Sequence, residues 1–422
     1  MRILPLGVLL LSLMASVFPA SAANPAPDPD NAELKLPPGF QALVVADNLG
    51  PIRFMTISPA GDIYLRKKKD GLVVLHDADG DGRAESVQTF GDGGGTGVAL
   101  HNGYVYYSSD DAVFRQALKP GELVPSGEKE TIVKGLPNKG QHNAKSFAFD
   151  PEGNLFVEVG SPSNSFGTPD RALGAKGGDP TEFLKTHGGW WRFSADKLNQ
   201  EQKDGTHFST GHRHMLGIAW HPVSKSFFVM QMGRDQLSTV APQFYDAEMS
   251  AEQPSEVMYR LKEGGNYGWP FAYYDWQQKS YMAAPEYGGD GKKKAEGADK
   301  YEPPLVAFPG HWAPLQTVIY TGTQFPEKYR NGAFVAFHGS WNRAPKPQRG
   351  YNVSFVPFDA KGLPLGSYEI FADGFSGLDE VQSPGQAKHR PCGLAMGPDG
   401  SLYVGDDAHG RVYRIIYTGA KP

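Results

Sequence analysis

The chain has 422 residues, with 46 acidic and 41 basic side chains and a formal net charge of −5 at pH 7. This mild acidity argues against nucleic acid as a general partner, because such binding depends on Lys and Arg that neutralise phosphates. The single cysteine, Cys392, excludes an intrachain disulfide, so a closed fold must be held by strand pairing and packing.

The N-terminus has the pattern of an export signal. Met1 and Arg2 precede the apolar run ILPLGVLLLSLMASVF, and PASA follows with the spacing of small residues found at cleavage sites. The run is shorter than the roughly 20 apolar residues of a membrane-spanning helix. We therefore predict a signal peptide over residues 1–22, cleaved after Ala22, with no membrane anchor and a periplasmic mature protein. Residues 23–36, which begin with a stretch rich in Pro and Asp, are predicted to be a disordered lead.

One pattern then recurs six times: a short polar or Gly-led onset, an alternating apolar strand, a turn and a second strand. The onsets lie near residues 53, 97, 142, 213, 316 and 390. The first two intervals, 44 and 45 residues, match a four-stranded propeller blade, and the later ones, 71, 103 and 74 residues, leave room for inserted loops. The sequence predicts an all-β domain over residues 37–418: a six-bladed β-propeller with four-stranded antiparallel blades. We expect the ring to be closed by pairing of QALVVA, residues 41–46, with VYRIIY, residues 412–417.

The first motif with chemical content is D-A-D-G-D-G-R-A-E, at residues 77–85. Carboxylates at alternate positions followed by Gly can wrap a hard cation, which makes Asp77, Asp79, Asp81 and Glu85 candidate ligands of a structural calcium ion. The pattern lacks the flanking helices of an EF-hand. An acidic hairpin turn without metal is the alternative.

The polar residues at the strand onsets are expected to meet. In a propeller the first strand of each blade lines the central channel, so equivalent strand ends converge on one mouth. These ends carry cations, imidazoles and one amide: Arg53, Arg213, Arg390, His142, His214 and Gln316. A single Arg before a strand is usually a surface charge, but like charges brought together favour an anion between them. The pattern therefore predicts a multiply anionic ligand.

Three more polar clusters fall on the inserted loops. They are MGRD at residues 232–235, GGNYGWP at residues 264–270 and HGSWNR at residues 338–343. The last adds a cation and an aromatic ring, which suit a planar anion. The alternative for each cluster is a structural role, in which its residues form turns and its aromatic rings pack between blades.

With these motifs in place, the chain resembles the soluble quinoprotein glucose dehydrogenase and L-sorbosone dehydrogenase family. The resemblance spans roughly residues 37–416 and rests on four stretches: HRHxLGIAWHP from His212, GGNYGWP from Gly264, FHGSWNR from Phe337 and RPCGLAxGPDGSLYV from Arg390. It implies a six-bladed propeller that uses pyrroloquinoline quinone with calcium. The implied reaction is oxidation of a sugar or aldose by hydride transfer, with an external electron acceptor. The chain is expected to be a monomer or homodimer.

The resemblance also implies roles for individual residues. His142 matches the catalytic base at a strand onset. Arg213 and His214 match an Arg-Asn pair that holds the quinone, and Arg213 would also polarise the accepting carbonyl. The backbone carbonyls of Gly233 and Arg234 would hold calcium against the cofactor.

Further cations complete the implied cofactor site, and several positions depart from the family pattern. Arg343, in place of a Lys, and Arg390 would bind the quinone, with Arg53 as an additional cation of the mouth. Gln141 replaces the acidic residue that precedes the base in glucose dehydrogenases, so the orienting partner of His142 must come from elsewhere. Residues 160–165, GSPSNS, stand where sorbosone dehydrogenase relatives often have paired cysteines.

Two other functions remain open from the residues alone. One is a non-catalytic exported propeller that binds a glycan or protein through its mouth. The other is a calcium-dependent, lactonase-like hydrolase, which would activate water with metal and carboxylates in the channel. The hydrolase predicts Asp, Glu or Asn at the strand onsets, whereas this chain has mostly Arg and His there.

Overall fold

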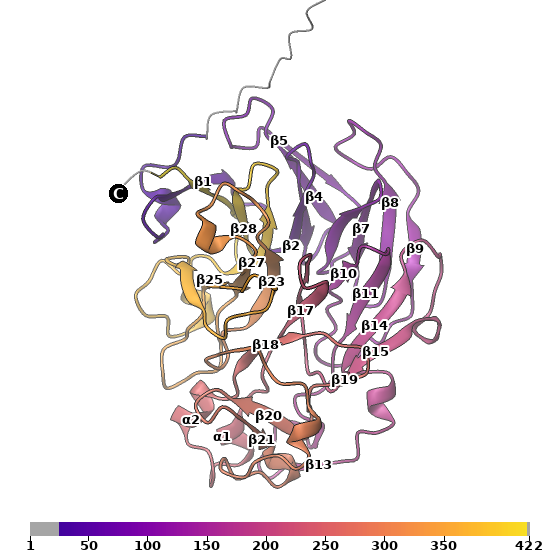
Figure 1. The fold of residues 1–422 in the computed structure, drawn as a ribbon, viewed down its shortest axis with the longest axis vertical. Helices are drawn as coiled ribbons and strands as arrows, with labels where there is room; N and C mark the ends of the chain where they lie inside the picture. The colour runs from indigo at the N-terminus through magenta and orange to yellow at the C-terminus, as the bar shows by residue number, and fades with distance from the viewer. Residues whose placement is uncertain (1–24, 420–422) are drawn as a thin grey trace, which may run out of the picture.

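The computed structural model of the chain describes residues 25–419. Its strands form six blades arranged in a ring, as predicted (Figure 1). The predicted signal peptide, residues 1–22, lies outside the described residues. No helix in the described part combines the length and the apolar character needed to cross a membrane.

Each blade is one antiparallel sheet, whose strands follow one another from the channel outward. The first three blades are β2 (Ile52–Ile57), β3 (Ile63–Lys67), β4 (Leu72–His76) and β5 (Ser86–Phe90); β6 (Val98–His101), β7 (Tyr104–Ser108), β8 (Val113–Ala117) and β9 (Glu130–Val133); and β10 (Phe147–Phe149), β11 (Asn154–Val159), β14 (Gly189–Ser194) and β15 (Thr206–Thr210), to which β19 (Gly265–Asn266) adds in parallel. The last three are β16 (Gly217–His221), β17 (Ser226–Gln231), β18 (Glu256–Arg260) and β22 (Val306–Phe308); β23 (Pro314–Ile319), β24 (Ala333–Phe337), β25 (Asn352–Val356) and β26 (Glu369–Ala372); and β27 (Pro391–Met396), β28 (Leu402–Asp406), β29 (Val412–Tyr417) and β1 (Phe40–Ala46).

The first strand of each blade lines the channel. β2, β6, β10, β16, β23 and β27 contact one another in this order, and β27 returns to β2. Gln316 on β23 ties three of them together: its Oε1 accepts from the amides of Met55 and Leu394, both at 2.9 Å, and its Nε2 donates to the Met55 carbonyl at 2.8 Å. We call the channel end at which these strands begin the mouth.

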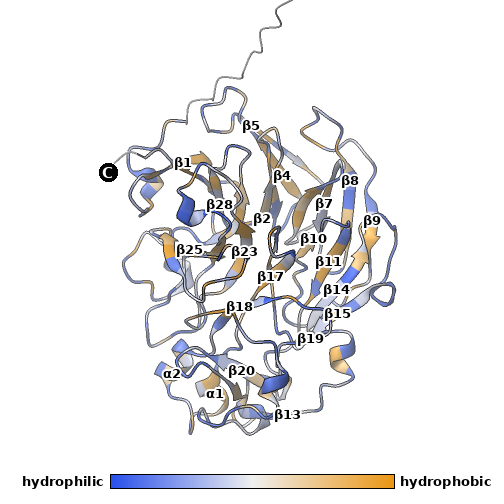
Figure 2. Ribbon diagram, in the orientation of Figure 1, coloured by the Kyte–Doolittle hydropathy of each residue, from blue (hydrophilic) through white to orange (hydrophobic). Residues whose placement is uncertain are grey.

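The ring closes as the sequence predicts. β1 pairs antiparallel with β29, with Phe40 opposite Tyr417 and Val44 opposite Tyr413. Behind this seam, Phe40 packs edge-on against Phe325 and Phe371, with ring centroids 4.8 and 5.0 Å apart. The strands are largely hydrophobic (Figure 2), and the apolar side chains of neighbouring blades bury one another.

The described part of the lead, residues 25–36, is ordered, contrary to the prediction. Asp28 accepts from the amide of Val44 at 2.9 Å and from the guanidinium of Arg83 at 2.6 Å. Ala32 and Leu34 are buried. The segment is held because its polar side chains satisfy β1 donors and its apolar side chains join the blade six core.

The long intervals between repeats come from insertions that build a lobe beside the mouth, at the bottom of Figure 1. Blade three contributes β12 (Gly167–Thr168) and β13 (Lys176–Gly177). Blade four contributes α1 (Leu237–Val240), α2 (Ala247–Glu252), β20 (Ala272–Asp275) and β21 (Ser280–Ala283). Short 3-10 turns complete the described helices: η1 (Asn31–Glu33), η2 (Phe183–Lys185), η3 (Gln202–Asp204), η4 (Pro285–Tyr287), η5 (Ala298–Lys300), η6 (Glu327–Tyr329) and η7 (Pro384–Gln386). The two insertions touch where β13 of blade three contacts η4 of blade four.

Candidate functional site

Two cavities at the mouth meet at His142. The insert-side cavity has a volume of about 280 Å³ and is lined by His142, Arg171, Arg213, Asp235, Glu256 and Trp341, among others. The blade-one cavity, of about 700 Å³, is lined by His142, His214, Arg53, Lys68, Lys69 and Asp110, among others. Of the six predicted strand ends, His142, His214, Arg213 and Arg53 line these two cavities, whereas Gln316 and Arg390 line neither.

His142 is held in a defined tautomer. Its backbone has a positive φ of 54°, in the loop that precedes β10. Its Nδ1 lies 2.6 Å from the Ser161 carbonyl oxygen. A carbonyl only accepts, so Nδ1 carries the proton and Nε2 is left with its lone pair. Burial, with the nearby Arg213 and His214, lowers the pKa of His142 well below its usual value. The ring is therefore a neutral proton acceptor at pH 7.

The Ser161 carbonyl is the orienting partner that the sequence left unassigned. Gly160, just before it, has no room for a side chain, because a Cβ there would lie 2.6 Å from the His142 carbonyl oxygen. Gln141 instead connects to the inserted loop: its Nε2 donates to Asp170 at 2.8 Å, and its Oε1 accepts from Arg171 at 2.6 Å.

Arg213 is buried and fixed by an internal carboxylate. Its Nη2 donates to Asp235 Oδ2 at 2.7 Å and to Asn164 Oδ1 at 3.0 Å. Asp235 also accepts from Arg171 at 2.9 Å and from Asn342 at 2.8 Å. Burial alone would raise the pKa of Asp235, but Arg213 and the other donors hold it well below its usual value. Asp235 is thus an ionised carboxylate that links blade four to the loops of blades three and five that carry Arg171 and Asn342.

A second carboxylate balances the cations on the opposite side of the mouth. Asp407 accepts from Arg53 Nη1 at 2.9 Å and lies 2.5 Å from His338 Nε2. Burial opposes ionisation of Asp407, but His338, Arg53 and Arg390 lower its pKa well below the usual value. Arg390 itself donates to the carbonyls of His338 and Gly339, at 3.1 and 2.9 Å.

These pairs correct the argument that the clustered arginines need an external anion. Arg53 and Arg213 are already balanced by Asp407 and Asp235, which lie far from them in sequence. Within the part of the chain that the structure describes, Lys68 and Lys69 line the blade-one cavity and form no ion pair. They lie on the turn between β3 and β4, outside every motif that the sequence pattern singled out.

Arg343 also differs from its expected role. Its side chain is only 1% exposed, and it lines neither mouth cavity. Its Nη2 donates to Glu252 at 2.6 Å, its Nε donates to the Pro347 carbonyl at 3.2 Å, and its Nη1 donates to the carbonyls of Ala251 and Gly310. Arg343 therefore anchors α2 and the loop before β23, and its donors are not available to a ligand in the mouth.

The two candidate metal sites lie at opposite ends of the channel. Gly233 borders the insert-side cavity, and its amide donates to Glu256 at 2.9 Å. The Arg234 guanidinium is buried and pairs with Glu286, so the side chain is not part of this site, and the predicted role of its backbone carbonyl stays a prediction. Antiparallel alternation in blade one puts the β4–β5 turn at the far end of the channel.

That far-end turn brings the predicted calcium ligands together. Ligand oxygens of Asp77, Asp79, Asp81 and Glu85 lie within 4.8 Å of one another. The Gly80 and Gly82 amides already donate to Asp77, both at 2.8 Å. The same arrangement is therefore also consistent with an acidic turn that binds no metal ion. A cation here would be structural, since the turn is remote from His142.

Sequence reasoning missed several residues of the site. Asp235 was part of the MGRD motif, but a lone carboxylate gives no sign of its partners. Arg171 lies in an inserted loop without a repeat equivalent. Glu158 reads as an ordinary strand residue, yet it is fully buried and lies against His214.

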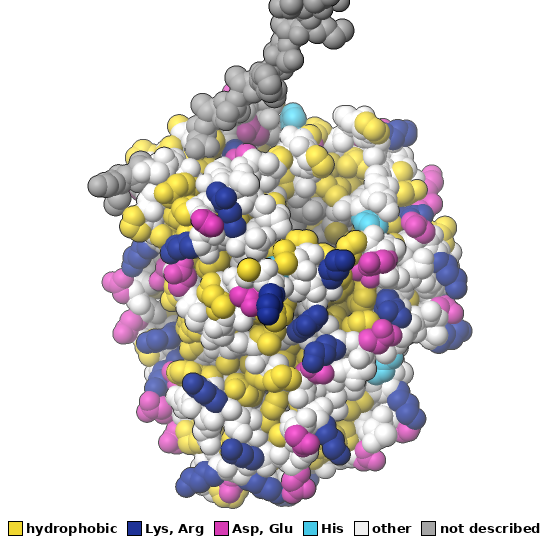
Figure 3. Space-filling view, viewed as in Figure 1, with side chains coloured by type: hydrophobic (Ala, Val, Ile, Leu, Met, Phe, Trp, Pro, Cys, Tyr) yellow, Lys and Arg dark blue, Asp and Glu magenta, His cyan; other side chains and the backbone are white. Residues whose placement is uncertain are grey.

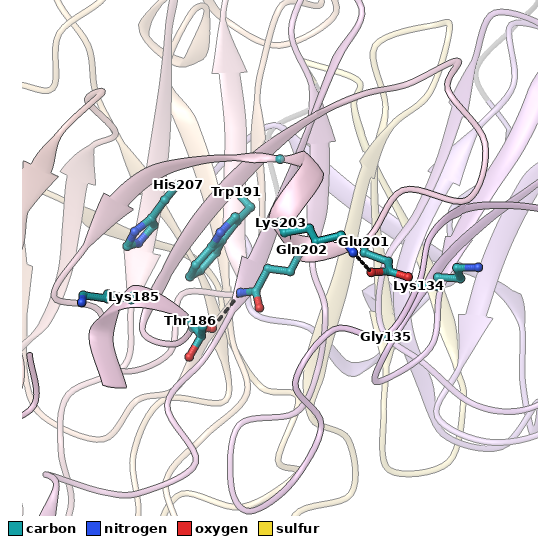
Figure 4. Close-up of a pocket in the computed structure, with 10 residues that line it drawn as sticks. Lys134, Gly135, Lys185, Thr186, Trp191, Glu201, Gln202, Lys203 and His207 are labelled. Carbon is teal, nitrogen blue, oxygen red and sulfur yellow. Dashed lines mark hydrogen bonds and ion pairs between the residues drawn. The ribbon is translucent and has the colours of Figure 1, made fainter. Parts of the chain in front are cut away.

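A third cavity, of about 660 Å³, lies on the outer edge of blade three (Figure 4). Its Trp191 and His207 rings stack at 4.3 Å. Two of its lysines are paired, Lys203 with Glu201 and Lys185 with Glu182. Figure 3 shows Lys and Arg side chains both in the middle of the face viewed there and around its rim.

Comparison with known proteins agrees with this architecture. Among curated proteins, an uncharacterized protein of Borreliella burgdorferi is 28% identical over 220 residues, 52% of this chain and 51% of that protein. A pyrroloquinoline quinone-dependent pyranose dehydrogenase of Coprinopsis cinerea is 28% identical over 193 residues, 40% of this chain and 26% of that protein. The chain thus matches about half or less of the length of these relatives.

Solved structures share the fold. The calcium structure of a Trichoderma reesei carbohydrate-active enzyme of family AA12 superposes with a TM-score of 0.75 at 17% identity, covering 94% of this chain and 99% of that one. The holo pyranose dehydrogenase PQQ domain of Coprinopsis cinerea gives 0.72 at 19%, covering 91% and 97%. The PQQ-bound aldose sugar dehydrogenase of Streptomyces coelicolor gives 0.56 at 16%, covering 90% and 99%.

A family model described as TrAA12-like matches residues 34–418, nearly the whole propeller. The expected kinship with quinone-dependent sugar dehydrogenases is confirmed, and the chain belongs to the TrAA12-like family.

Proposed function

We propose that the protein is a quinone-dependent oxidoreductase that oxidises a sugar or aldose at the mouth of the propeller. The observation that carries the proposal is His142: a neutral imidazole whose Nδ1 is fixed on the Ser161 carbonyl and whose Nε2 is free beside two cavities. Kinship with pyrroloquinoline quinone-dependent sugar oxidoreductases supports the reaction class.

The lining of the mouth fits pyrroloquinoline quinone, a flat tricarboxylate. Lys68 and Lys69, which form no ion pair with any residue in 25–419, offer cations at the blade-one cavity, and Arg53 lines its wall. Gly233 borders the adjoining cavity, and its backbone carbonyl would suit a hard cation such as calcium. When bound, the quinone would supply the hydride acceptor that no side chain provides.

The residues of this chain would then handle the proton and the substrate. His142 Nε2 would take the hydroxyl proton while hydride leaves the same substrate carbon. The Ser161 carbonyl would stabilise the imidazolium that results. Arg213, held by Asp235, would keep a fixed positive charge beside the developing negative charge. Trp341, which is 54% exposed at the edge of the insert-side cavity, offers a flat surface to a sugar ring.

The carboxylates at the mouth do not favour the hydrolase. Asp235 is held by the guanidinium groups of Arg171 and Arg213, and Asp407 by Arg53 and the His338 ring, which leaves both carboxylates poor ligands for a catalytic metal. Glu256 accepts from two backbone amides, those of Gly233 and Ala313.

A direct assay tests the proposal. Cofactor-free protein is mixed with pyrroloquinoline quinone and calcium, and reduction of a dye is followed with a panel of aldoses. Turnover that needs both quinone and sugar supports the proposal. Quinone binding without turnover of any sugar would instead indicate a binding protein.

We also propose export through the signal peptide at residues 1–22, with cleavage after Ala22. Mass spectrometry of the mature N-terminus of exported protein tests this step, and the dye assay is best run on the same exported protein.

A further inference from the structure

Asn164, in the insertion of blade three, contacts the guanidinium of Arg213 with both of its oxygens. Arg213 Nε donates to the backbone carbonyl of Asn164 at 3.1 Å, and Nη2 donates to the side-chain Oδ1 at 3.0 Å. Nε and Nη2 form one edge of the planar guanidinium, so a single residue binds that whole edge. Asn164 is fully buried, so solvent does not compete for these contacts.

The side chain of Asn164 is itself fixed in one orientation. Its Nδ2 donates to the Asp235 carbonyl at 3.0 Å, and its Oδ1 also accepts from the Asp235 amide at 2.8 Å. Exchanging Oδ1 and Nδ2 would set donor against donor at that amide and at Arg213, and acceptor against acceptor at the carbonyl. The backbone carbonyl of Asn164 also accepts from Trp269 Nε1 at 3.1 Å. Trp269 belongs to GGNYGWP, so this predicted cluster helps to hold Asn164.

These contacts leave one nitrogen of Arg213 for a ligand. The second hydrogen of Nη2 is bound to Asp235 Oδ2 at 2.7 Å, so three of the five N–H groups of the guanidinium have acceptors. No residue between 25 and 419 accepts from Nη1. Arg213 lines the insert-side cavity together with His142. Nη1 is therefore the donor that a ligand in this cavity can use.

We propose that Asn164 is a positioning residue of the mouth, which binds the Nε–Nη2 edge of Arg213 and thereby presents Nη1 to the ligand. Asp235 supplies the opposite charge, but its single bond to Nη2 would let the guanidinium pivot. The inference deepens the proposed function and rests on it for its catalytic meaning. There, Nη1 would face the negative charge that develops on the reacting oxygen, and a donor already in place needs no reorganisation during the reaction.

Arginine NMR of cofactor-free protein tests the orientation. The arginines are labelled with ¹⁵N, and the Arg213 signals are assigned by their loss in Arg213→Lys. A guanidinium held along one edge turns slowly about its Nε–Cζ bond, so Nη1 and Nη2 should give separate signals in unmodified protein. Asn164→Ala removes the Oδ1 acceptor, and the two signals should merge. Asn154→Ala is the matched control, an amide at the far end of β11 that donates to Asp150 at 2.8 Å, and should leave them separate.

Turnover with quinone and sugar measures what the orientation contributes to the reaction. Asn164→Ala should lower kcat by roughly tenfold to hundredfold, since displacing a group by about 1 Å can cost 10²-fold. In an Arg213→Lys background the same change should have little effect, because lysine has no planar fork to orient. Such non-additivity marks a residue that acts through Arg213, whereas a general loss of stability would lower turnover alike in both backgrounds.

Separate Arg213 Nη signals in Asn164→Ala, or an equal loss of turnover in both backgrounds, overturns the proposal. If Asn164→Ala does not fold, unmodified protein decides: separate Nη signals support the proposal, and merged ones overturn it. The NMR measurement needs no cofactor. Merged signals in Asn164→Ala, in a protein that never oxidises a sugar with quinone, therefore contradict the proposed function alone. Quinone-dependent turnover with Arg213 signals that Asn164→Ala leaves separate contradicts only the positioning role.

Discussion

At the residue scale, the proposed chemistry depends on the free nitrogen of His142. Replacement by Gln keeps a polar side chain but removes the proton acceptor, so turnover should fall by roughly 10²–10⁴-fold. Quinone affinity should stay near wild type, because Lys68, Lys69 and Arg53 are unchanged. The pKa of His142 is lowered by burial, so wild-type activity should hold until well below pH 6.5. Wild-type turnover in the variant would show that another residue is the catalytic base, and His214 would be the first alternative.

A second residue-scale prediction concerns stability. Burial raises the pKa of Glu256 to about 7 from 4.5. Because the folded protein binds this proton more tightly than the unfolded chain does, protonation of Glu256 stabilises the fold. The stabilisation is fully present below pH 4.5 and is lost as the pH rises through 7. Glu256→Gln stays neutral, so its unfolding free energy relative to wild type should improve from pH 5 to pH 8, by on the order of 3 kcal/mol.

Urea denaturation of both proteins at the two pH values measures that difference. Any hydrogen bond weakened by the amide costs about 1 kcal/mol at both pH values and cancels from the comparison. Equal differences at pH 5 and pH 8 would show that Glu256 is ionised in the fold.

At the scale of elements, the seam between β1 and β29 closes the ring, and Phe40 is its main apolar anchor. Phe40→Ala leaves a cavity among Phe325, Tyr329 and Phe371 and should destabilise the protein by about 3–5 kcal/mol. Val87→Ala, on the exposed outer strand β5, is the control and should change stability by less than about 0.5 kcal/mol. Chemical denaturation compares the two variants, and similar small losses would mean that the seam contributes little to the ring.

The turn between β3 and β4 carries the other element-scale prediction. Lys68→Ala with Lys69→Ala removes the two unpaired cations of the blade-one cavity, so quinone affinity should fall about threefold to thirtyfold and depend less on salt. Lys185→Ala with Lys203→Ala, in the outer cavity of Figure 4, is the matched control. Fluorescence titration with quinone measures both. Equal quinone affinities of the two double variants would show that the carboxylates of the quinone do not bind at Lys68 and Lys69.

At the scale of the whole molecule, repetition made the architecture predictable. Six onsets and two terminal strands were enough to predict the blades and their closure, because each blade has the same alternation of apolar residues. Repeat position also predicted that His142, His214, Arg213 and Arg53 meet. It could not predict the partners of Asp235 and Asp407, most of which come from other blades, or the burial of Arg343 against α2. The Pro-rich lead was misread because composition does not reveal that Asp28 and Asn31 bind the edge of β1.

The pairing of β1 with β29 also sets an order of events for the newly made chain. Residues 40–46 emerge first and residues 412–417 last, yet they are neighbours in one sheet. Five blades can assemble from contiguous segments, whereas the sixth must wait until almost the entire polypeptide is available. The mouth, which is completed by Arg390 and Asp407 of that sixth blade, is therefore the last part of the protein to form, and a chain interrupted before residue 412 has neither a closed ring nor a finished site.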